Sequence, residues 1–201
     1  MDILSRKKTQ DSGRGFTLIE MLVVVAIMVV VSTVVLANNG RFGGTAVLQN
    51  IAYEIALSVR QAQIYGISVR RFTDNSYASA YGMHFSEGAN TFELFADVVD
   101  ADGMYTRTRS GGELVQSTTI RSGYTISKLC TSKENCDGIG VRMLDISFRR
   151  PETEAWISAN GTACTTACYA RACVELKSPR GDIRAVIITV NGQIEVKNTC
   201  L

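Results

Sequence analysis

Residues Phe16 to Ala37 read FTLIEMLVVVAIMVVVSTVVLA, and this apolar run decides the fold. It contains 22 residues and a single charged side chain, Glu20. At about 1.5 Å per residue, a helix of this length measures about 33 Å, which is enough for a hydrocarbon core about 30 Å thick. A helix in a soluble bundle is rarely apolar on all sides over such a length. The run therefore predicts a membrane-spanning helix over residues 16–37.

Glu20 is an unusual residue in such a run, because an ionised carboxylate inside a transmembrane helix costs about 2.5 to 3.5 kcal/mol. Its position near one end of the run reduces this cost. One interpretation is a glutamate at the membrane surface whose side chain reaches water. The other interpretation is a carboxylate with a functional partner, and the residues alone leave both open.

The leader that precedes the run, residues 1–15, is basic. It has four basic and two acidic side chains, a net charge of +2: Arg6, Lys7, Lys8 and Arg14 against Asp2 and Asp11. Basic residues beside an apolar run keep that end of the chain in the cytoplasm. A secretory signal would have a shorter apolar core and a small-residue cleavage site on its far side, whereas Asn38-Asn39-Gly40-Arg41 follows here.

The combination of a basic leader ending in Gly15, the string Phe16-Thr17-Leu18-Ile19-Glu20 and an unbroken apolar helix closely resembles the type IV prepilin signal. This signal is shared by type IV pilins and type II secretion pseudopilins. The resemblance implies that a prepilin peptidase cleaves the Gly15–Phe16 bond and that the new amino terminus on Phe16 is N-methylated. It also implies that Glu20 pairs with the terminal ammonium of a neighbouring subunit, which would neutralise a costly buried charge.

The residues after the run predict a second helical segment. The stretch NNGRFGG at 38–44 is expected to weaken the helix locally rather than end it. Apolar residues then recur every four positions at Val47, Ile51, Ile55 and Val59, which predicts an amphipathic helix over 45–65. Its remaining face carries Glu54, Arg60, Gln61 and Gln63. Gly66 is expected to be its C-cap. The sequence LQNIAYEIALSVRQAQIYGISVR, from Leu48 to Arg70, resembles the same segment of FimT/GspH-type minor pilins and pseudopilins.

The remainder of the chain has the two-residue periodicity of strands. A hairpin is expected from Tyr81–Phe85 and Thr91–Val99, and Asn191-Gly192 is expected to turn the strand Arg184–Val190 into Gln193–Lys197. Weaker strands are expected near Leu114–Ile120, Tyr124–Leu129, Gly140–Arg149 and Cys173–Leu176. A helix followed by many antiparallel strands predicts an α+β fold in which the sheet lies on the long helix, with residues 38–201 as one globular domain.

All six cysteines follow the apolar run: Cys130, Cys136, Cys164, Cys168, Cys173 and Cys200. An even number of cysteines in the part of the chain that is exported across a membrane favours disulfides in an oxidising compartment. Sequence alone allows 15 pairings. We expect the pairs Cys130–Cys136, Cys164–Cys168 and Cys173–Cys200. Zinc is the weaker alternative, because the cysteine spacings fit zinc-ribbon pairs poorly.

The sequence gives little support for an enzyme or for a cofactor. Its only histidine, His84, lies in an alternating strand and is expected at a half-buried sheet position. Asp97, Asp100 and Asp102 resemble the start of a short calcium loop, with Glu113 as a loose further ligand, but an Asp-Gly turn is the stronger interpretation. We therefore expect no enzyme activity, no cofactor and no metal site other than this weaker calcium possibility.

Nucleic acid is not an expected partner. Some FimT-like minor pilins capture DNA with a Gly-Arg-x-Arg stretch near the C-terminus, whereas this chain has Gly192-Gln193-Ile194-Glu195 there. Without the leader, the chain has 17 basic and 17 acidic side chains, so no net charge attracts phosphates. Trp156, the only tryptophan, is expected in a loop, either packed against the protein or in contact with a partner.

These observations predict a structural subunit of a type IV pilus or a type II secretion pseudopilus, of the FimT/GspH kind. Its partners would be other pilin or pseudopilin subunits, the prepilin peptidase and the lipid of a bacterial inner membrane, with the C-terminal domain in the periplasm before assembly into the filament. Two alternatives stay open: a DNA-binding minor pilin for natural transformation, and a membrane-anchored ectodomain unrelated to filaments.

Overall fold

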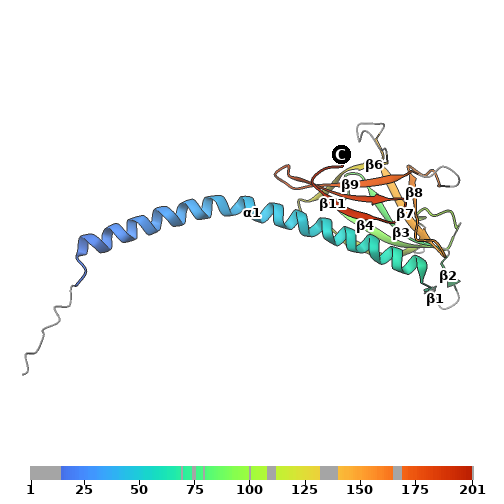
Figure 1. Cartoon of the computed structure of the whole chain (residues 1–201), viewed down its shortest axis with the longest axis horizontal. Coiled ribbons are helices and arrows are strands. Elements are labelled where there is room, and N and C mark those ends of the chain that lie inside the picture. Colours follow the sequence, from blue (N-terminus) through green and yellow to red (C-terminus); the bar gives the residue numbers. More distant parts are fainter. Residues whose placement is uncertain are drawn as a thin grey trace, which may run out of the picture. The chain divides into compact units, whose positions relative to one another are not determined.

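A computed structural model describes residues 15–68, 70–73, 76–78, 80–99, 101–107, 112–131, 140–164 and 169–200. These residues form a long helix followed by strands, and the predicted α+β class is confirmed (Figure 1). By its contacts the chain divides into two compact units, Met1–Phe42 and Gly43–Leu201. The elements are α1 (Leu18–Ile67), β1 (Arg71–Thr73), β2 (Ser76–Tyr77), β3 (Ala80–Ser86), β4 (Thr91–Asp97), β5 (Leu114–Thr119), β6 (Thr125–Cys130), β7 (Met143–Arg149), β8 (Ala155–Ala159), β9 (Arg171–Lys177), β10 (Ile183–Thr189) and β11 (Ile194–Lys197).

Helix α1 begins at Leu18 because Thr17 caps its first turn. The hydroxyl of Thr17 accepts a hydrogen bond from the backbone N–H of Glu20 at 3.3 Å, and its carbonyl accepts from Met21 at 3.2 Å. Threonine followed three residues later by glutamate is the sequence pattern of a helix capping box. The helix then continues through residues 38–44 to Ile67, so the expectation that these glycines do not end it is confirmed.

The C-terminal half of α1 is the amphipathic helix that the sequence predicts. Its buried face consists of residues spaced three or four apart, each fully buried: Leu48, Ala52, Ile55, Val59 and Ala62. Burying a leucine, isoleucine or valine side chain stabilises a fold by about 1.5–3 kcal/mol. These side chains belong to one core cluster with residues from both large sheets, so α1 is held to the strands along this face.

Gly66 is not the C-cap that the sequence suggests, because it lies inside α1. A Cβ atom at this position would lie 2.4 Å from the backbone oxygen of Phe148 and 2.8 Å from its Cβ atom. The glycine is therefore needed for the close approach of α1 to β7. The helix ends one residue later, where the Ser68 N–H donates to the carbonyl of Ile64 at 3.0 Å.

The strands form antiparallel sheets of five, four and two strands among the described residues. The five-stranded sheet has the order β5-β4-β3-β7-β8, and the four-stranded sheet has the order β11-β10-β9-β6. The predicted hairpin is present as β3 and β4, with Phe85 opposite Phe92. The Asn191-Gly192 turn also joins β10 to β11 as expected, with Gly192 at a φ of 79° and Ile188 opposite Ile194.

Strand β8 corrects the expectation that Trp156 lies in a loop. Residues Ala155–Ala159 pair with β7, and Trp156 stands opposite Ser147. The tryptophan is half-buried, and the guanidinium carbon of Arg149 lies 4.2 Å from the centroid of its ring. Strand pairing and a cation–π contact therefore hold Trp156 on the sheet.

Candidate functional site

The residues of the predicted cleavage site lie just before the helix. Gly15 and Phe16 are outside α1, and the side chain of Phe16 is 77% exposed. A Cβ atom built on Gly15 would have no atom within 4 Å. The Gly15–Phe16 bond is thus in an open, non-helical segment, which is the kind of backbone that a peptidase can bind.

Glu20 lies in the first turn of α1, three residues after the Thr17 cap, and is exposed. The partial positive charge of a helix N-terminus favours a carboxylate there. The backbone N–H of Glu20 is part of the Thr17 cap, because it donates to the Thr17 hydroxyl at 3.3 Å. An exposed carboxylate at this place can also accept an ammonium group from another molecule.

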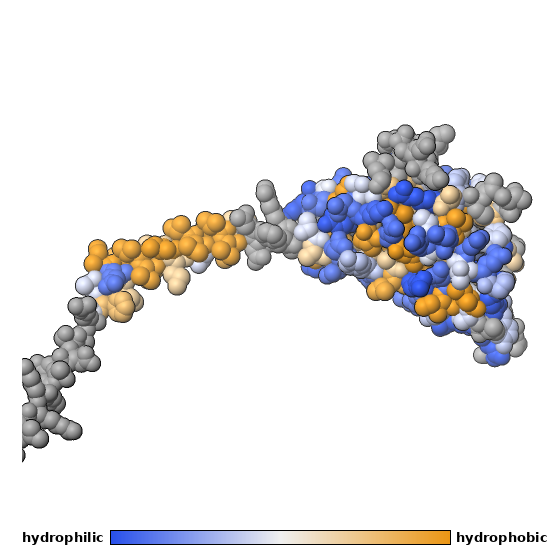
Figure 2. All heavy atoms as spheres, viewed as in Figure 1, coloured by the Kyte–Doolittle hydropathy of each residue, from blue (hydrophilic) through white to orange (hydrophobic). Residues whose placement is uncertain are grey.

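The residues that follow, Leu18–Ala37, form one helix that is long and apolar enough to cross a membrane, by length and composition. None of this stretch is buried inside the protein. Figure 2 shows one face of it as a mostly apolar surface with a hydrophilic patch near its start. A stretch of this kind needs lipid or other apolar helices around it.

A second exposed apolar surface lies on the C-terminal half of α1. We call Tyr53, Leu57, Ile64 and Ile67 the outer stripe. These side chains are 52%, 70%, 57% and 40% exposed. Their spacing of three, four or seven residues places them in one row along the helix, apart from the buried row that packs on the sheets.

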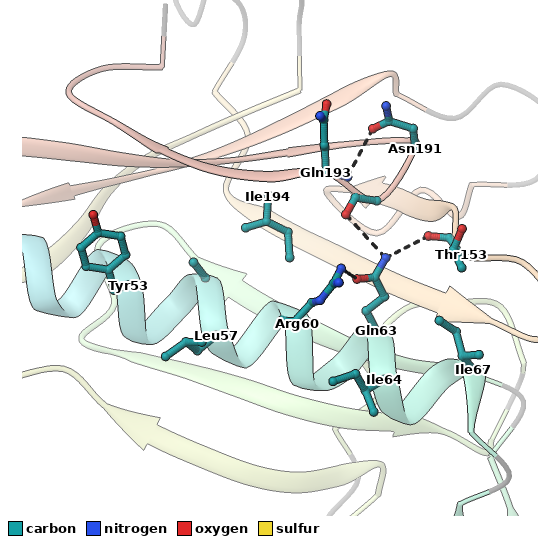
Figure 3. A pocket seen from close by; sticks show the side chains of 12 residues that line it. Tyr53, Leu57, Arg60, Gln63, Ile64, Ile67, Thr153, Asn191, Gln193 and Ile194 are labelled. Carbon is teal, nitrogen blue, oxygen red and sulfur yellow. Dashed lines mark hydrogen bonds between the residues drawn. The ribbon is translucent and has the colours of Figure 1, made fainter.

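The outer stripe forms one wall of a groove of about 730 Å³. The other wall comes from Thr153 and from the β10–β11 turn, residues 191–194. The side chains of Arg60 and Gln63 extend from α1 toward this second wall (Figure 3). The groove is mainly apolar, with a few polar groups that converge on Gln63.

Gln63 corrects another expectation, because it is buried and does not lie on a solvent-exposed face. Its Nε2 donates to the carbonyls of Thr153 at 3.2 Å and Gly192 at 3.5 Å, and its Oε1 accepts a hydrogen bond from Arg60 (Figure 3). A Cβ atom on Gly192 would lie 2.5 Å from Gln63 Nε2. The amide therefore connects the helix to two separate loops, and Gly192 makes room for it.

The outer stripe has a sequence signal that periodicity at every fourth residue does not show. Positions 53, 57, 60, 64 and 67 alternate in steps of four and three, which is the a/d spacing of a coiled-coil seam. A small hollow on the apolar stretch is lined by Val25, Met28, Val29, Ser32, Thr33 and Leu36. The a/d spacing is typical of a helix that packs lengthwise against other helices.

The acidic residues considered for calcium have structural roles in the part that is described. Asp97 is fully buried, and its Oδ2 accepts the N–H of Gly103 at 2.9 Å and lies 4.0 Å from the Arg149 guanidinium. Asp102 accepts the N–H of Met104 within the turn. Asp100 lies outside the described residues. Within the described ranges, no three His, Cys, Asp or Glu side chains are grouped so that they could hold a metal ion.

Glu113 is held in the same loop by three backbone groups. Its two oxygens accept the N–H groups of Val98, Val99 and Thr106 at 2.8–3.0 Å. Burial raises the pKa of this carboxyl, these hydrogen bonds oppose the rise, and Asp97 adds to it. Glu113 therefore orders the segment between β4 and β5 instead of facing a ligand.

His84 takes the partly buried sheet position that was expected for it. Its Nδ1 lies 2.6 Å from an oxygen of Asp145, and its Nε2 lies 3.1 Å from the hydroxyl of Ser86. This order of groups resembles a hydrolase triad. However, the N–H groups of residues 87, 88 and 89 all donate to protein carbonyls, so they cannot stabilise an oxyanion. The group is a hydrogen-bonded network on the outer face of the five-stranded sheet.

The four cysteines among the described residues are disulfide-bonded. Cys173 and Cys200 form the pair that was expected, which ties the C-terminal residues to β9. Cys130 and Cys164 are disulfide-bonded as well. Their expected partners, Cys136 and Cys168, lie outside the described residues.

Comparison with protein-family models finds the prokaryotic N-terminal methylation motif over residues 12–36. The match supports a type IV pilin-like protein. It covers the leader end, the capping box and most of the apolar stretch, and it is consistent with anchoring in a membrane. No curated protein matches the chain, and no solved structure matches it.

Proposed function

We propose that this pilin-like chain is a structural, non-enzymatic subunit of a type IV pilus or a type II secretion pseudopilus, of the minor pilin or pseudopilin kind. The observation that carries the proposal is that one helix, α1, joins the methylation motif to an exposed apolar stripe with coiled-coil spacing. A helix that serves only as a membrane anchor needs no exposed apolar stripe outside the lipid. A helix that packs against neighbouring subunits needs one as a contact surface.

In this proposal the prepilin peptidase cleaves the Gly15–Phe16 bond on the cytoplasmic side of the inner membrane, and Phe16 is then N-methylated. The apolar stretch holds the subunit in the membrane, with the strands in the periplasm, until it joins the filament. Glu20 pairs with the terminal ammonium of a neighbour, and the outer stripe and its groove contact a neighbouring helix. We also propose that the subunit is of the FimT/GspH type, because residues 48–70 resemble that group.

The first test is processing and the role of Glu20. In cells with an active prepilin peptidase, we expect mass spectrometry of the mature protein to find an N-methylated Phe16 as its first residue. Glu20→Gln keeps the shape of the side chain but removes its charge. We expect this variant to be processed normally and to enter filaments at least about tenfold less, because losing a charge pair in a low-dielectric interior costs several kcal/mol. Normal incorporation of Glu20→Gln would contradict the assembly role.

The second test concerns the outer stripe. Leu57→Arg places a charge at its most exposed position, and Glu54→Arg is the matched control on the same exposed helix but outside the groove. We expect Leu57→Arg to lower incorporation strongly and to leave the thermal unfolding temperature within a few degrees, because the side chain makes no core contact. Glu54→Arg should incorporate normally. Equal incorporation of both variants would show that the outer stripe is not part of the subunit interface. Incorporation of Glu20→Gln would still test the role of the N-terminal helix separately.

A further inference from the structure

The outer edge of β5 is open. This strand ends the five-stranded sheet and pairs only with β4. Five of its six residues are exposed, so both faces of the strand meet solvent. Among the described residues, no backbone group beyond β4 hydrogen-bonds to residues 114–119. An edge of this kind presents unpaired N–H and C=O groups to any extended chain that approaches it.

The other edges of the two large sheets are protected in the described part of the chain. Strand β8 is buried at four of its five positions, and a bridge between Ala159 and Thr162 lies at its end. Strand β11 carries the exposed pair Glu195 and Lys197, and charges on an edge oppose pairing. Strand β6 has a bridge from Leu129 to Val141. By contrast, β5 reads LVQSTT and has neither a charge nor a proline, and its pairing with β4 is regular from Gln116 to Thr119, with a shift of register only near Val115.

The register shows which backbone groups of β5 point outward. The N–H of Ile120 donates to the carbonyl of Asn90 at 2.7 Å, so this pair is hydrogen-bonded. Hydrogen-bonded and non-hydrogen-bonded pairs alternate along an antiparallel ladder. With Thr118 opposite Phe92 and Ser117 opposite Glu93, Thr118 bonds inward to β4 while Ser117 and Thr119 direct their backbone groups to the open side.

A cationic cleft lies at the N-terminal end of this edge. Its volume is about 280 Å³, and it is lined by Arg70, Arg71, Phe72, Tyr81, Leu114 and Val115. Both arginines are exposed, and no described carboxylate forms an ion pair with either of them or lines the cleft. Aromatic rings hold them in place: the Arg70 guanidinium lies 3.8 Å from the Tyr65 ring centroid, and Arg71 donates to the Tyr77 hydroxyl at 3.2 Å.

We propose that β5 binds an extended acidic peptide of a partner protein, which adds to the sheet as an antiparallel strand and ends with a carboxylate between Arg70 and Arg71. The direction follows from charge. In an antiparallel strand the C-terminal end lies beside Leu114, where two guanidinium groups can bind a carboxylate bidentately. A parallel strand would place its N-terminal ammonium there, next to two positive charges. Main-chain pairing gives such a complex its affinity, and the charged cleft gives it direction. The proposal does not rest on filament assembly.

The test uses the full chain in detergent micelles and a fluorescein-labelled peptide, Thr-Val-Thr-Val-Thr-Val-Asp, with a free C-terminal carboxylate. We expect a saturable rise in fluorescence anisotropy. The same peptide ending in an asparagine amide should bind about tenfold more weakly, because it lacks the charge-assisted hydrogen bonds. A peptide with alternate amides N-methylated should not bind, because it cannot form the ladder.

Two pairs of variants locate the site. Ser117→Pro removes an outward N–H without removing a bond to β4, a place where proline is tolerated at an edge, and Ser117→Ala is its control. We expect the proline variant to lose binding and the alanine variant to keep it. Arg71→Glu should weaken binding about tenfold or more, while Arg121→Glu, an exposed arginine just beyond the other end of β5, should not.

Several results would overturn the proposal. These are no binding of the acidic peptide, equal binding of its N-methylated form, or a loss with Arg121→Glu in place of Arg71→Glu, which would indicate a parallel strand. A dimer that Ser117→Pro dissociates, together with no peptide binding, would assign the edge to a second copy of this chain and would overturn it as well. The N-methylated peptide decides the question even if the proline variant fails to fold.

Discussion

At the scale of single residues, Glu113 organises the loop between β4 and β5. Its carboxylate accepts three backbone N–H groups from a segment that has no regular structure. Buried backbone donors need acceptors, and leaving one unsatisfied costs about 1–3 kcal/mol. The same burial raises the pKa of Glu113, so the side chain that orders the loop also links its stability to pH.

Glu113 is therefore expected to make the protein less stable as pH rises. Because its folded pKa lies above the unfolded value, which is ordinarily near 4.5, the folded state binds the proton more tightly. The contribution to stability is complete below the unfolded pKa and is lost as pH rises through the raised, folded pKa. Chemical denaturation at a series of pH values should show this decline, and Glu113→Gln should remove it.

The control for this measurement is Glu152→Gln, which changes an exposed glutamate in the loop before β8. Its pH profile should follow that of the unmodified protein. If Glu113→Gln left the decline unchanged above pH 4.5, another group would be responsible for it, and the role assigned to Glu113 in pH dependence would be wrong.

At the scale of elements, two glycines of α1 differ in their effect on stability. Gly66 lies against β7, where a Cβ atom would come within 2.4 Å of the Phe148 oxygen. Gly44 lies in the same helix, and the nearest atom to a Cβ there would be 4.0 Å away, on the carboxylate of Asp182. The first glycine is required by packing, whereas the second only lowers the helix propensity of the chain.

The two glycines give a matched pair of variants. Gly66→Ala is expected to lower the free energy of unfolding by about 2 kcal/mol or more, because backbone atoms of β7 would have to shift. Gly44→Ala is expected to raise it by about 0.5–1 kcal/mol, since alanine favours the helix and meets no neighbour. Urea denaturation followed by circular dichroism measures both. A Gly66→Ala protein as stable as Gly44→Ala would contradict the close approach of α1 to β7.

The elements that sequence predicts well are those whose signals are local. The apolar run and the apolar spacing after it locate α1, and alternation with an Asn-Gly turn locates β10 and β11. The errors arise where contacts distant in sequence decide the outcome. Gln63 is buried because its partners Thr153 and Gly192 lie 90 and 129 residues away, and Gly66 is inside the helix because of Phe148.

Candidate sites follow the same rule. The signal around Gly15, Phe16 and Glu20 can be read directly, because its motif is contiguous. The outer stripe is hard to recognise in the sequence, because the stronger apolar periodicity marks the face that packs on the sheets. Strand β8 is not apparent in the sequence, because Ala155–Ala159 is short and lies between a proline-containing loop and Asn160-Gly161. The open edge of β5 depends on strand order, which no local pattern gives.

At the scale of the whole molecule, the chain consists of an apolar stretch with no core of its own and a globular unit with a core of helix and sheets. The free energy of unfolding measured for this protein is therefore that of the unit from Gly43 onward. Its C-terminal residues are fixed by the Cys173–Cys200 disulfide and by the Arg171 side chain, which donates to the Cys200 carbonyl at 2.6 Å. These contacts hold the chain after β11 against β9.

Removing this cross-link should cost stability in proportion to the segment it closes. The two cysteines are 27 residues apart, and a loop of that size corresponds to about 3–4 kcal/mol. We expect the double variant Cys173→Ser/Cys200→Ser to unfold at lower urea, with the difference measured under oxidising conditions so that the other disulfides stay intact. A difference below about 1 kcal/mol would show that the C-terminal residues are held by their other contacts.

The amide of Gln63 has a consequence for the speed of association. By joining α1 to the Thr153 loop and to the β10–β11 turn, it fixes both walls of the groove before anything enters. An incoming helix would thus meet a preorganised surface and would not wait for a rearrangement, so that encounter frequency and orientation set the rate constant. Loosening this one side chain should slow docking even where the apolar contacts are unchanged.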